Sequence, residues 1–380
     1  MGRSVHTSLL QRTLDLAEAG RGSVHPNPMV GAVVERGGTV IATGFHHRYG
    51  DRHAEAVALD SAGHAARGAT LYCNLEPCSY SAANKHQPPC TTHIIDAGIS
   101  RVVIGQVDPN PRVRGSGIAQ LRAAGIEVVL AQDPASYWRF NASFNTTMAT
   151  QRPFVELKFA MSLDGKLATE TGHSQWISDE EGLTFAHQLR RNHDAVVVGV
   201  GTAITDDPLL SVRRVPGPSP RPVVLDSRLR LPPTSRLVRL RGTELIVITT
   251  DAAPTAARRR LERAGVTVMT LPTGHRVSIP EALDALWELG IRRVLVEGGG
   301  TVITAWLAAG TYDRVCAVVA PIVIGTGVAA IGDLGARTIH EAIHFDAVEW
   351  RLVGSQQVMR AFHPAWLARV QEDTHVHRLG

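Results

Sequence analysis

The chain is poor in cysteine and has no long apolar run, and both absences narrow its class. Its 380 residues include four cysteines, too few for a small secreted scaffold held together by disulfides. No apolar run approaches the roughly 20 residues that span a bilayer. The first 20 residues have the pattern of an amphipathic helix and not of a signal peptide. We therefore expect a cytoplasmic protein with no membrane partner.

Strong charge of either sign is also absent. The formal net charge is +4, and 44% of the residues are hydrophobic and 19% charged, as in an ordinary globular protein. The arginines are scattered, and the densest run, Arg258-Arg259-Arg260, lies on an expected helix where a solvated face is the simpler interpretation. The composition predicts no nucleic-acid partner, and its mild basicity would suit a small phosphorylated substrate.

A chain of this length favours two domains over one core. From about residue 30 to 131 strands alternate with helices, which predicts a three-layer α/β sandwich. Between 133 and 153 the pattern dissolves into what we interpret as a short helix plus a linker. A second α/β segment then starts at Pro153, with later helices expected near 254–264, 280–289 and 301–309. We predict domains at 1–149 and 150–380.

The sequence His53-Ala54-Glu55, followed by Pro77-Cys78 and Pro89-Cys90, most narrows the function. One imidazole and two thiolates match the ligand set of a zinc deaminase, which keeps a fourth coordination position open for water. Zinc makes such a water a nucleophile near neutral pH. Glu55, two residues after the histidine, is then available to carry a proton to the departing ammonia.

The simpler interpretations of these residues are weaker. Cys73 and Cys316 lie in apolar, strand-like runs and are expected to be core thiols. Cys78 and Cys90 differ because each follows a proline at a junction of loop and helix. A disulfide between these two is the alternative, and a reducing cytosol disfavours it.

Glycines and acids in the second half suggest a nucleotide site. The run Val296-Glu297-Gly298-Gly299-Gly300-Thr301 lies between an expected strand and helix, where a bare backbone and a helix N-terminus favour an anion. It is not the GxGxxG dinucleotide fingerprint. Asp206-Asp207-Pro208 follows a buried strand at a place where open α/β sheets bind ligands, and Trp176 offers a ring for stacking.

Taken together, these motifs resemble the bifunctional riboflavin-pathway deaminase/reductase family along nearly the whole chain. The first half matches at His25–Pro28, Val30-Gly31, Gly44–His46, His53–Glu55, Leu75–Cys78, Pro88–Cys90 and Asp108–Pro111. The second half matches at Lys158, Ser162–Lys166, Ser174–Ile177, Asp206–Pro208, Asp226-Ser227 and Val296–Gly299.

The resemblance implies two folds and two successive reactions. A cytidine-deaminase-like three-layer α/β/α domain would bind one zinc ion and hydrolytically deaminate a phosphoribosylated diaminopyrimidinone. A dihydrofolate-reductase-like α/β domain would then use NADPH to reduce the ribosyl group to ribityl. The protein need only align the hydride donor with the sugar carbon. The family resemblance also implies a homo-oligomer, a dimer or a tetramer.

Roles for individual residues follow from the same resemblance. His53, Cys78 and Cys90 would bind zinc, and Glu55 would move the proton. Substrate contacts are expected at Asn27, His46, Lys85, Asp108 and Asn110 in the deaminase half, and at Lys158, Ser174, Arg190, Leu210, Arg213 and Glu297 in the reductase half. NADPH contacts are expected at Trp176, Thr202, Asp206, Ser227, Gly299, Gly300 and Thr301.

One loop departs from the family pattern. Eleven residues separate Cys78 from Cys90, more than is usual, and Tyr80 stands where the family has a histidine. Lys85-His86-Gln87 replaces the usual Gly-Arg/Lys-Thr element. Either Lys85 or His86 supplies the missing polar contact, or the enzyme acts on a relative of the usual substrate. Lys85 itself is either a partner of the substrate phosphate or a solvated loop charge.

Three competing functions follow from these observations. The altered loop favours a paralogue in a specialised pathway of the toxoflavin type that diverts the same pyrimidine precursor. A nucleic-acid-editing deaminase is disfavoured because such enzymes carry CxxC and no reductase-like partner. A catalytically silent zinc scaffold is disfavoured because a structural site normally recruits a fourth protein ligand.

Overall fold

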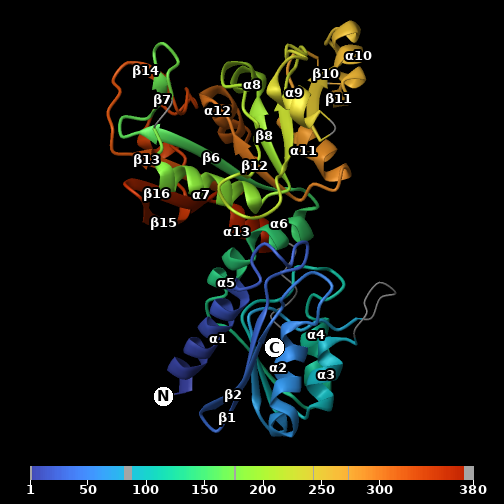
Figure 1. The fold of residues 1–380 in the computed structure, drawn as a ribbon. Helices are drawn as coiled ribbons and strands as arrows, with labels where there is room; N and C mark the ends of the chain where they lie inside the picture. Colours follow the sequence, from blue (N-terminus) through green and yellow to red (C-terminus); the bar gives the residue numbers. More distant parts are fainter. Residues whose placement is uncertain (1, 81–87, 175–176, 243, 273, 372–380) are drawn as a thin grey trace. The chain divides into compact units, whose positions relative to one another are not determined.

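The computed structural model describes residues 2–80, 88–174, 177–242, 244–272 and 274–371, with the side chains from residue 6 onward (Figure 1). Residues that lie close together in space divide the chain into two compact units. One contains Met1–Gln151 and Leu367–Gly380, and the other contains Arg152–Trp366. The functional boundary at 149/150 stays a prediction. In the described residues no helix is both long and apolar enough to cross a membrane.

The first unit contains a mixed sheet with the strand order β2-β1-β3-β4-β5. Its strands are β1 (Gly31–Arg36), β2 (Thr39–Phe45), β3 (Thr70–Cys73), β4 (Arg101–Ile104) and β5 (Glu127–Leu130). Its helices are α1 (Gly2–Glu18), α2 (Ala54–Ala62), α3 (Cys90–Asp96), α4 (Ser116–Ala123), α5 (Ala135–Phe140) and α6 (Ala142–Thr150). β3, β4 and β5 are parallel, and the β1–β2 hairpin is antiparallel.

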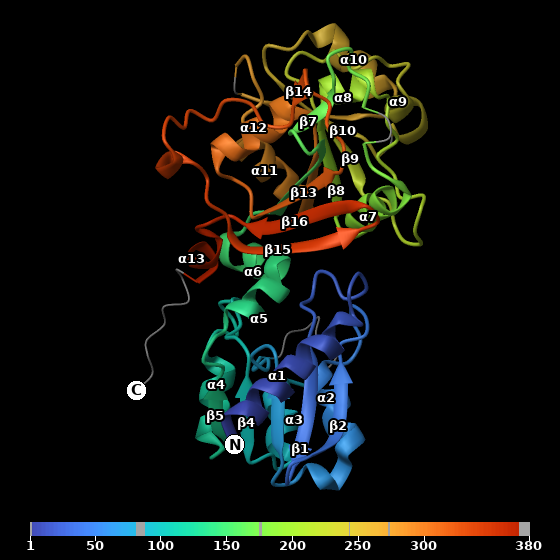
Figure 2. The same cartoon turned by 90° about the vertical axis from the view of Figure 1, so that its left-hand side faces the viewer.

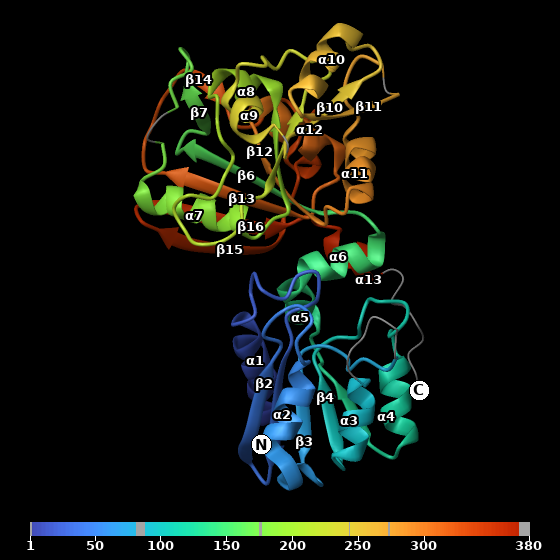
Figure 3. The same ribbon diagram turned by 45° about the vertical axis from the view of Figure 1, so that its right-hand side comes forward.

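Alternation along the strands produces the three layers. Side chains of successive strand residues point to opposite faces. Leu71 and Cys73 pack in one core cluster with the apolar residues of α2, α3 and α4. Tyr72 packs in the other cluster with α1 and α5. α1 covers one face of the sheet, and α2, α3 and α4 cover the other (Figures 2 and 3). The predicted three-layer α/β/α fold is confirmed.

The second unit is built on a larger sheet with the order β11-β10-β9-β8-β12-β6-β13-β16-β15. Strands β6 (Phe154–Ser162), β8 (Ala195–Gly199), β9 (Arg221–Leu225), β10 (Ile246–Thr250), β11 (Thr267–Leu271), β12 (Arg293–Glu297) and β13 (Arg314–Ala320) run parallel. β15 (Asp346–Val353) and β16 (Gln356–Phe362) add an antiparallel edge. β7 (Lys166–Thr169) and β14 (Gly327–Ala329) pair separately.

Helices cover both faces of this sheet. The helices are α7 (Glu180–Arg191), α8 (Val200–Thr205), α9 (Arg236–Arg241), α10 (Thr255–Arg263), α11 (Ile279–Glu288) and α12 (Gly300–Ala309). The last helix of the described chain, α13 (Trp366–Gln371), starts at the final residue of this unit, and its other residues belong to the first unit. α11 and α12 pack in one cluster, while α8, α9 and α10 pack in another. The predicted α/β class is confirmed.

Three segments differ from the sequence-based expectation. Residues 133–153 form two helices, α5 and α6, where a short helix plus a linker was expected. The pattern of residues 53–68 predicts a single helix that Gly68 ends, but α2 ends at Ala62, because Gly63 has a φ of 53°, outside the α-helical region. The strands β14, β15 and β16 were not predicted.

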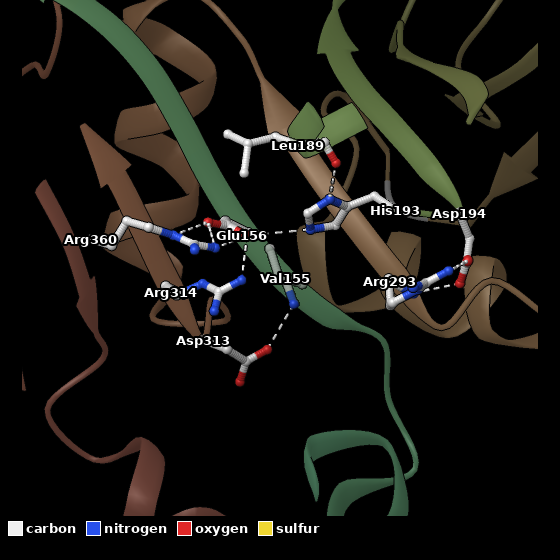
Figure 4. Close-up of polar contacts among 9 residues, drawn as sticks. All are labelled: Val155, Glu156, Leu189, His193, Asp194, Arg293, Asp313, Arg314 and Arg360. Atoms are coloured by element: carbon white, nitrogen blue, oxygen red, sulfur yellow. Dashed lines mark hydrogen bonds and ion pairs between the residues drawn. The ribbon is translucent and has the colours of Figure 1, made fainter. Parts of the chain in front are cut away.

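A buried ion network holds the centre of the second sheet together (Figure 4). Glu156 on β6 is fully buried. Its carboxylate accepts hydrogen bonds from Arg314 Nη2 at 2.6 Å and from Arg360 Nη2 at 2.9 Å. Nε2 of His193 lies 3.5 Å from the same carboxylate. Burial acts to raise the pKa of Glu156, but the two guanidinium groups outweigh it and hold that pKa well below its usual range.

Glu156→Gln should destabilise the second unit by about 3–5 kcal/mol, because it leaves two partly buried guanidinium groups without their counter-charge. Because the folded pKa is lowered, the stabilisation is complete above the usual carboxyl pKa and is lost as the pH falls through the folded pKa. The stability of the second unit should therefore fall less steeply with decreasing pH in the variant than in the wild-type protein. Calorimetry against pH tests both effects, using the transition that NADPH shifts.

Asp333→Asn is the matched control, because the Asp333–Arg337 pair is 71% exposed on both sides, and solvent screens such a pair so that its loss should have little effect on stability. Equal losses in the two variants would contradict a special role for the buried network.

Candidate zinc centre and nucleotide site

Three side chains meet at the start of two helices in the first unit. His53 precedes α2 as its N-cap, Cys90 is the first residue of α3, and Cys78 lies in the loop after β3. His53 Nδ1 lies 3.1 Å from Cys90 Sγ and 3.6 Å from Cys78 Sγ, and the two sulfurs are 3.4 Å apart. The structure thus brings together all three predicted metal ligands.

This donor set fits zinc. Tetrahedral bonds of about 2.0–2.3 Å place the ligand atoms about 3.6–3.8 Å apart, within a few tenths of an ångström of the spacing here. No disulfide joins the two cysteines in the described structure, so the predicted choice of metal over disulfide agrees with it. Hydrogen bonding with Cys90 and then with His53 outweighs burial and lowers the pKa of Cys78 to about 3, so this ligand is a thiolate.

Glu55 is the second residue of α2, the helix for which His53 is the N-cap. The side chain is 4% exposed, and its Oε2 atom has no hydrogen-bond partner among the described residues. Burial raises the pKa of this carboxyl. A buried oxygen of this kind normally has a partner, so the site has the geometry for a ligand atom between Glu55 and the three metal ligands.

One cavity contains Glu55 and most of the expected pyrimidine contacts. Its lining includes Asn27, His46, Tyr49, His53, Glu55, Cys78, Tyr80, Asp108 and Asn110. Asn27 Nδ2 and His46 Nε2 are 3.1 Å apart, and His46 Nδ1 is 3.1 Å from the carbonyl of Arg52. Both contacts are satisfied when His46 carries its proton on Nδ1. Burial lowers the pKa of His46, which favours this neutral form.

Glu76 is a residue of this site that the sequence analysis did not select. Its buried carboxylate accepts backbone N–H groups from Asp108 at 3.1 Å, Gly115 at 3.0 Å and Gly117 at 3.0 Å. The loop that presents Asp108 and Asn110 to the cavity is therefore fastened to the residue two positions before Cys78. A charged residue directly before Pro77-Cys78 was the available signal.

The altered loop is only partly visible. Tyr80 lines the cavity. Lys85, with His86 and Gln87, lies outside the described residues.

Most expected NADPH contacts share a cavity at the carboxyl ends of β8, β9 and β12. Thr202, Ser227, Gly299, Gly300 and Thr301 all line it. Asp206 is not among the lining residues, and Trp176 lies outside the described residues. A Cβ built on Gly201 would meet nothing within 4 Å, and one on Gly299 would meet only Thr202 Oγ1 at 3.6 Å. This open, bare-backbone cradle beside the start of α12 fits a dinucleotide phosphate.

A charged cluster adjoins this cavity along β12. Glu297 pairs in register with Lys158 of β6 and accepts a 2.6 Å bond from Arg190 Nη2 of α7. Burial acts to raise the pKa of Glu297, but Arg190 lowers it overall. Arg213 Nη1 donates to Ser211 Oγ at 2.8 Å. The structure thus brings together four of the six expected substrate contacts of this half.

The other two expected contacts contribute differently. Leu210 lies next to Ser211 and is buried with a φ of 52°. Ser174 is exposed and lines neither of the two cavities.

His187 is a second residue that the sequence analysis missed. Its Nδ1 accepts the backbone N–H of Arg213 at 3.0 Å. Burial and the nearby Arg190 and Arg213 charges lower the pKa of His187 to about 4, so it is neutral and can accept this bond. Its position three residues before Arg190 on one helix was the available signal.

Comparisons with known proteins agree with these two sites. Residues 3–106 match the model of the cytidine and deoxycytidylate deaminase zinc-binding region, and residues 153–363 match that of the RibD C-terminal domain. The chain is 41% identical over 344 residues to the riboflavin biosynthesis protein RibD of Aquifex aeolicus, covering 90% of this chain and 94% of that one. Identity to the Escherichia coli protein is 33% over 359 residues, covering 91% and 96%.

Solved structures match along nearly the whole chain as well. RibD of Acinetobacter baumannii superposes with a TM-score of 0.79 at 31% identity, covering 94% of this chain and 99% of that one. A Thermotoga maritima protein superposes with a TM-score of 0.78 at 33% identity, covering 96% and 100%. That protein is described as a diaminohydroxyphosphoribosylaminopyrimidine deaminase/5-amino-6-(5-phosphoribosylamino)uracil reductase.

Fold and sites thus define a zinc-dependent deaminase joined to an NADPH-dependent reductase, acting on a small molecule. The chain belongs to the RibD family of riboflavin biosynthesis enzymes. These relatives support the riboflavin-pathway interpretation and not the specialised-pathway alternative.

Replacing Cys78 by Ala should remove most of the bound zinc and destabilise the first unit, because metal binding is coupled to folding. Cys73→Ala is the matched control, since Cys73 is a buried thiol outside the metal cluster and its loss should leave the zinc content unchanged. Elemental analysis of both purified variants reads the outcome. Full zinc occupancy in a Cys78→Ala, Cys90→Ala double variant would contradict the ligand assignment.

Proposed function

We propose that the first unit deaminates a phosphoribosylated diaminopyrimidinone and that the second reduces the ribosyl group of the product to ribityl. The carrying observation is the buried, unpartnered oxygen of Glu55 beside three converging zinc ligands. The description of the Thermotoga maritima relative supports this choice of substrate.

In the deaminase unit, zinc would supply a Lewis acid that makes water nucleophilic near neutral pH. His53, Cys78 and Cys90 hold the metal in this proposal. Glu55 Oε2 accepts the proton of the attacking water and passes it to the amino group that leaves as ammonia.

Substrate orientation in the same unit falls to other side chains that line the cavity. The neutral His46 ring holds the Asn27 side chain, whose amide oxygen and nitrogen suit the donor and acceptor edge of a pyrimidine ring. Asp108 and Asn110 face the same space and are braced by Glu76. These are groups for recognising a polar ring and sugar, with the reacting carbon directed toward Glu55.

In the reductase unit, NADPH would supply a hydride to the sugar carbon. Lys158, Arg190 and Arg213 provide cations for a phosphorylated substrate. Glu297, held by Arg190, keeps a fixed carboxylate beside Lys158 for the sugar hydroxyls. Thr202, Ser227 and the turn Gly299–Thr301 hold the cofactor.

We also propose that the chain works as a homo-oligomer in the cytoplasm. Val348, Trp350 and Leu352 are exposed at alternate positions of the edge strand β15, and an exposed apolar edge favours pairing with another copy. Sedimentation of the full chain and of Trp350→Glu would test the assembly, and cell fractionation the compartment.

Glu55→Gln should lower the deaminase rate by about 10²–10⁴-fold, the usual effect of removing a general acid/base. Zinc content and the reductase rate, assayed with the deaminated intermediate, should stay at the wild-type level. Ammonia release from the pyrimidine phosphate, measured beside NADPH oxidation, separates the two activities. Near-normal deamination would show that another group moves the proton.

Gly299→Val should weaken NADPH binding by about tenfold or more, because the new side chain enters the open cradle. The nearest atom to the added Cβ is Thr202 Oγ1 at 3.6 Å, an ordinary contact, so the fold should tolerate the change. Cofactor fluorescence titrations of the full chain measure the affinity. Unchanged affinity would place the cofactor elsewhere.

A further inference from the structure

Four basic side chains surround one end of the cofactor cavity. Arg228 and Arg230 follow β9, and His275 and Arg276 follow β11; together we call them the basic rim. All four line the cavity that Gly299 and Thr202 also line, and all four are exposed. In the described part of the chain no ion pair joins any of them to an acid. Burial raises the pKa of the neighbouring Asp226, and the charge of Arg230 acts against that shift. A single buried acid therefore stands near four basic side chains.

The acids nearest to the basic rim in the sequence, Asp226 and Asp251, accept hydrogen bonds from backbone N–H groups. Asp226 is fully buried, and its carboxylate accepts the backbone N–H of Leu231 at 2.8 Å. Asp251 accepts the backbone N–H of Gly274 at 3.2 Å. Both carboxylates therefore shape the loops that carry the basic rim.

The two loops are also tied to each other. Ser227 Oγ accepts the backbone N–H of Val277 at 3.0 Å, which joins the segment after β9 to the segment after β11. Thr250 Oγ1 donates to the carbonyl of Ser227 at 3.1 Å. The backbone beneath the basic rim is therefore held in place before any ligand arrives, which reduces the ordering cost of binding.

Position in the sheet indicates which anion the basic rim meets. The turn Gly299–Thr301 at the start of α12 follows β12, and only β8 lies between β12 and β9. Two strand spacings, about 10 Å, separate Arg228 and Arg230 after β9 from that turn. His275 and Arg276 follow β11, and the bond from Val277 N to Ser227 Oγ joins their loop to the loop after β9. In a nicotinamide dinucleotide the adenosine ribose is bonded directly to the pyrophosphate. If the pyrophosphate lies at the turn, this ribose is therefore the next group of the cofactor, within reach of the loop after β9. NADPH differs from NADH by a single phosphate on the 2′-oxygen of that ribose.

We propose that Arg228, Arg230 and Arg276, with His275 beside them, bind the 2′-phosphate of NADPH and so select NADPH over NADH. The inference rests on the assignment of this cavity to the nicotinamide cofactor in the proposed function. None of the four residues was among the contacts expected from the family resemblance. Exposed arginines that fork around a phosphate bind it through paired, charge-assisted hydrogen bonds.

The pyrimidine substrate is a second source of phosphate. Its phosphate already has Lys158, Arg190 and Arg213, which do not line this cavity. Ser227, an expected cofactor contact, lies directly beside Arg228 and fastens the two loops of the basic rim. The cofactor phosphate is therefore the better match, and the substrate phosphate becomes an outcome of the test.

The test compares two cofactors on the zinc-loaded full chain. Arg228→Gln, Arg276→Gln and the double variant are titrated with NADPH and with NADH by cofactor fluorescence. The double variant should raise the NADPH Kd by about tenfold to a hundredfold, the loss expected for one or more charge-assisted hydrogen bonds. The NADH Kd should change by less than about twofold, and the salt dependence of NADPH binding should become shallower.

Arg260→Gln is the matched control, because Arg260 is an exposed arginine on α10 that does not line the cavity. It should leave both dissociation constants unchanged, which separates a local phosphate contact from a general effect of net charge.

Three results would overturn the inference. They are an unchanged NADPH Kd in the double variant, an equal loss of NADPH and NADH affinity, and a rise only in the KM for the pyrimidine phosphate. The last would assign the basic rim to the substrate. Gly299→Val distinguishes a failure of this inference from a failure of the proposed function, because it should weaken the binding of both NADPH and NADH. If it weakens the binding of neither, the cavity itself is wrongly assigned.

Discussion

A zinc ion with three protein ligands requires that two helices of the first unit begin at the same place. His53 and Cys90 are the residues at which α2 and α3 start, and Cys78 comes from the loop between β3 and α3. The three ligand atoms approach within 3.1–3.6 Å. The small side chains Ala54 and Ala58 of α2, both buried, let that helix lie close to the sheet. Packing and metal binding are therefore one constraint in this unit.

In the second unit, a buried network of charged side chains fixes the position of a site residue. Glu156 is buried among Arg314, Arg360 and His193 in the middle of the sheet. Two residues further along β6, on the same face, Lys158 is level with Glu297. A strand that could slip by one residue would turn Lys158 to the opposite face. The buried carboxylate, which finds its partners in only one register, thereby also fixes the position of the substrate-facing lysine.

Sequence patterns predicted what depends on local spacing. Period-two alternation and helix signals located most elements, and the distance between His53 and Glu55 needs only a helix start to be meaningful. They failed where the outcome depends on distant partners. Asn141 interrupts the segment 133–153 between two short helices, and its side chain accepts the backbone N–H of Met29, a partner 112 residues away that no local window contains. Glu76 and His187 were missed for the same reason, because their backbone partners come from other loops.

The basic rim is a functional site that sequence patterns also could not reveal, because its residues come together only in the folded chain. Arg228 and Arg276 are 48 positions apart and carry no motif, so each resembles an isolated surface arginine in the sequence. They line one cavity because parallel strands deliver their following loops to the same edge of the sheet. The turn Gly299–Thr301 that meets the shared part of a dinucleotide lies on another strand. Recognition of the shared pyrophosphate and recognition of the distinguishing phosphate are thus carried by separate loops, so cofactor preference can change in one loop pair while the turn that holds every nicotinamide dinucleotide stays as it is.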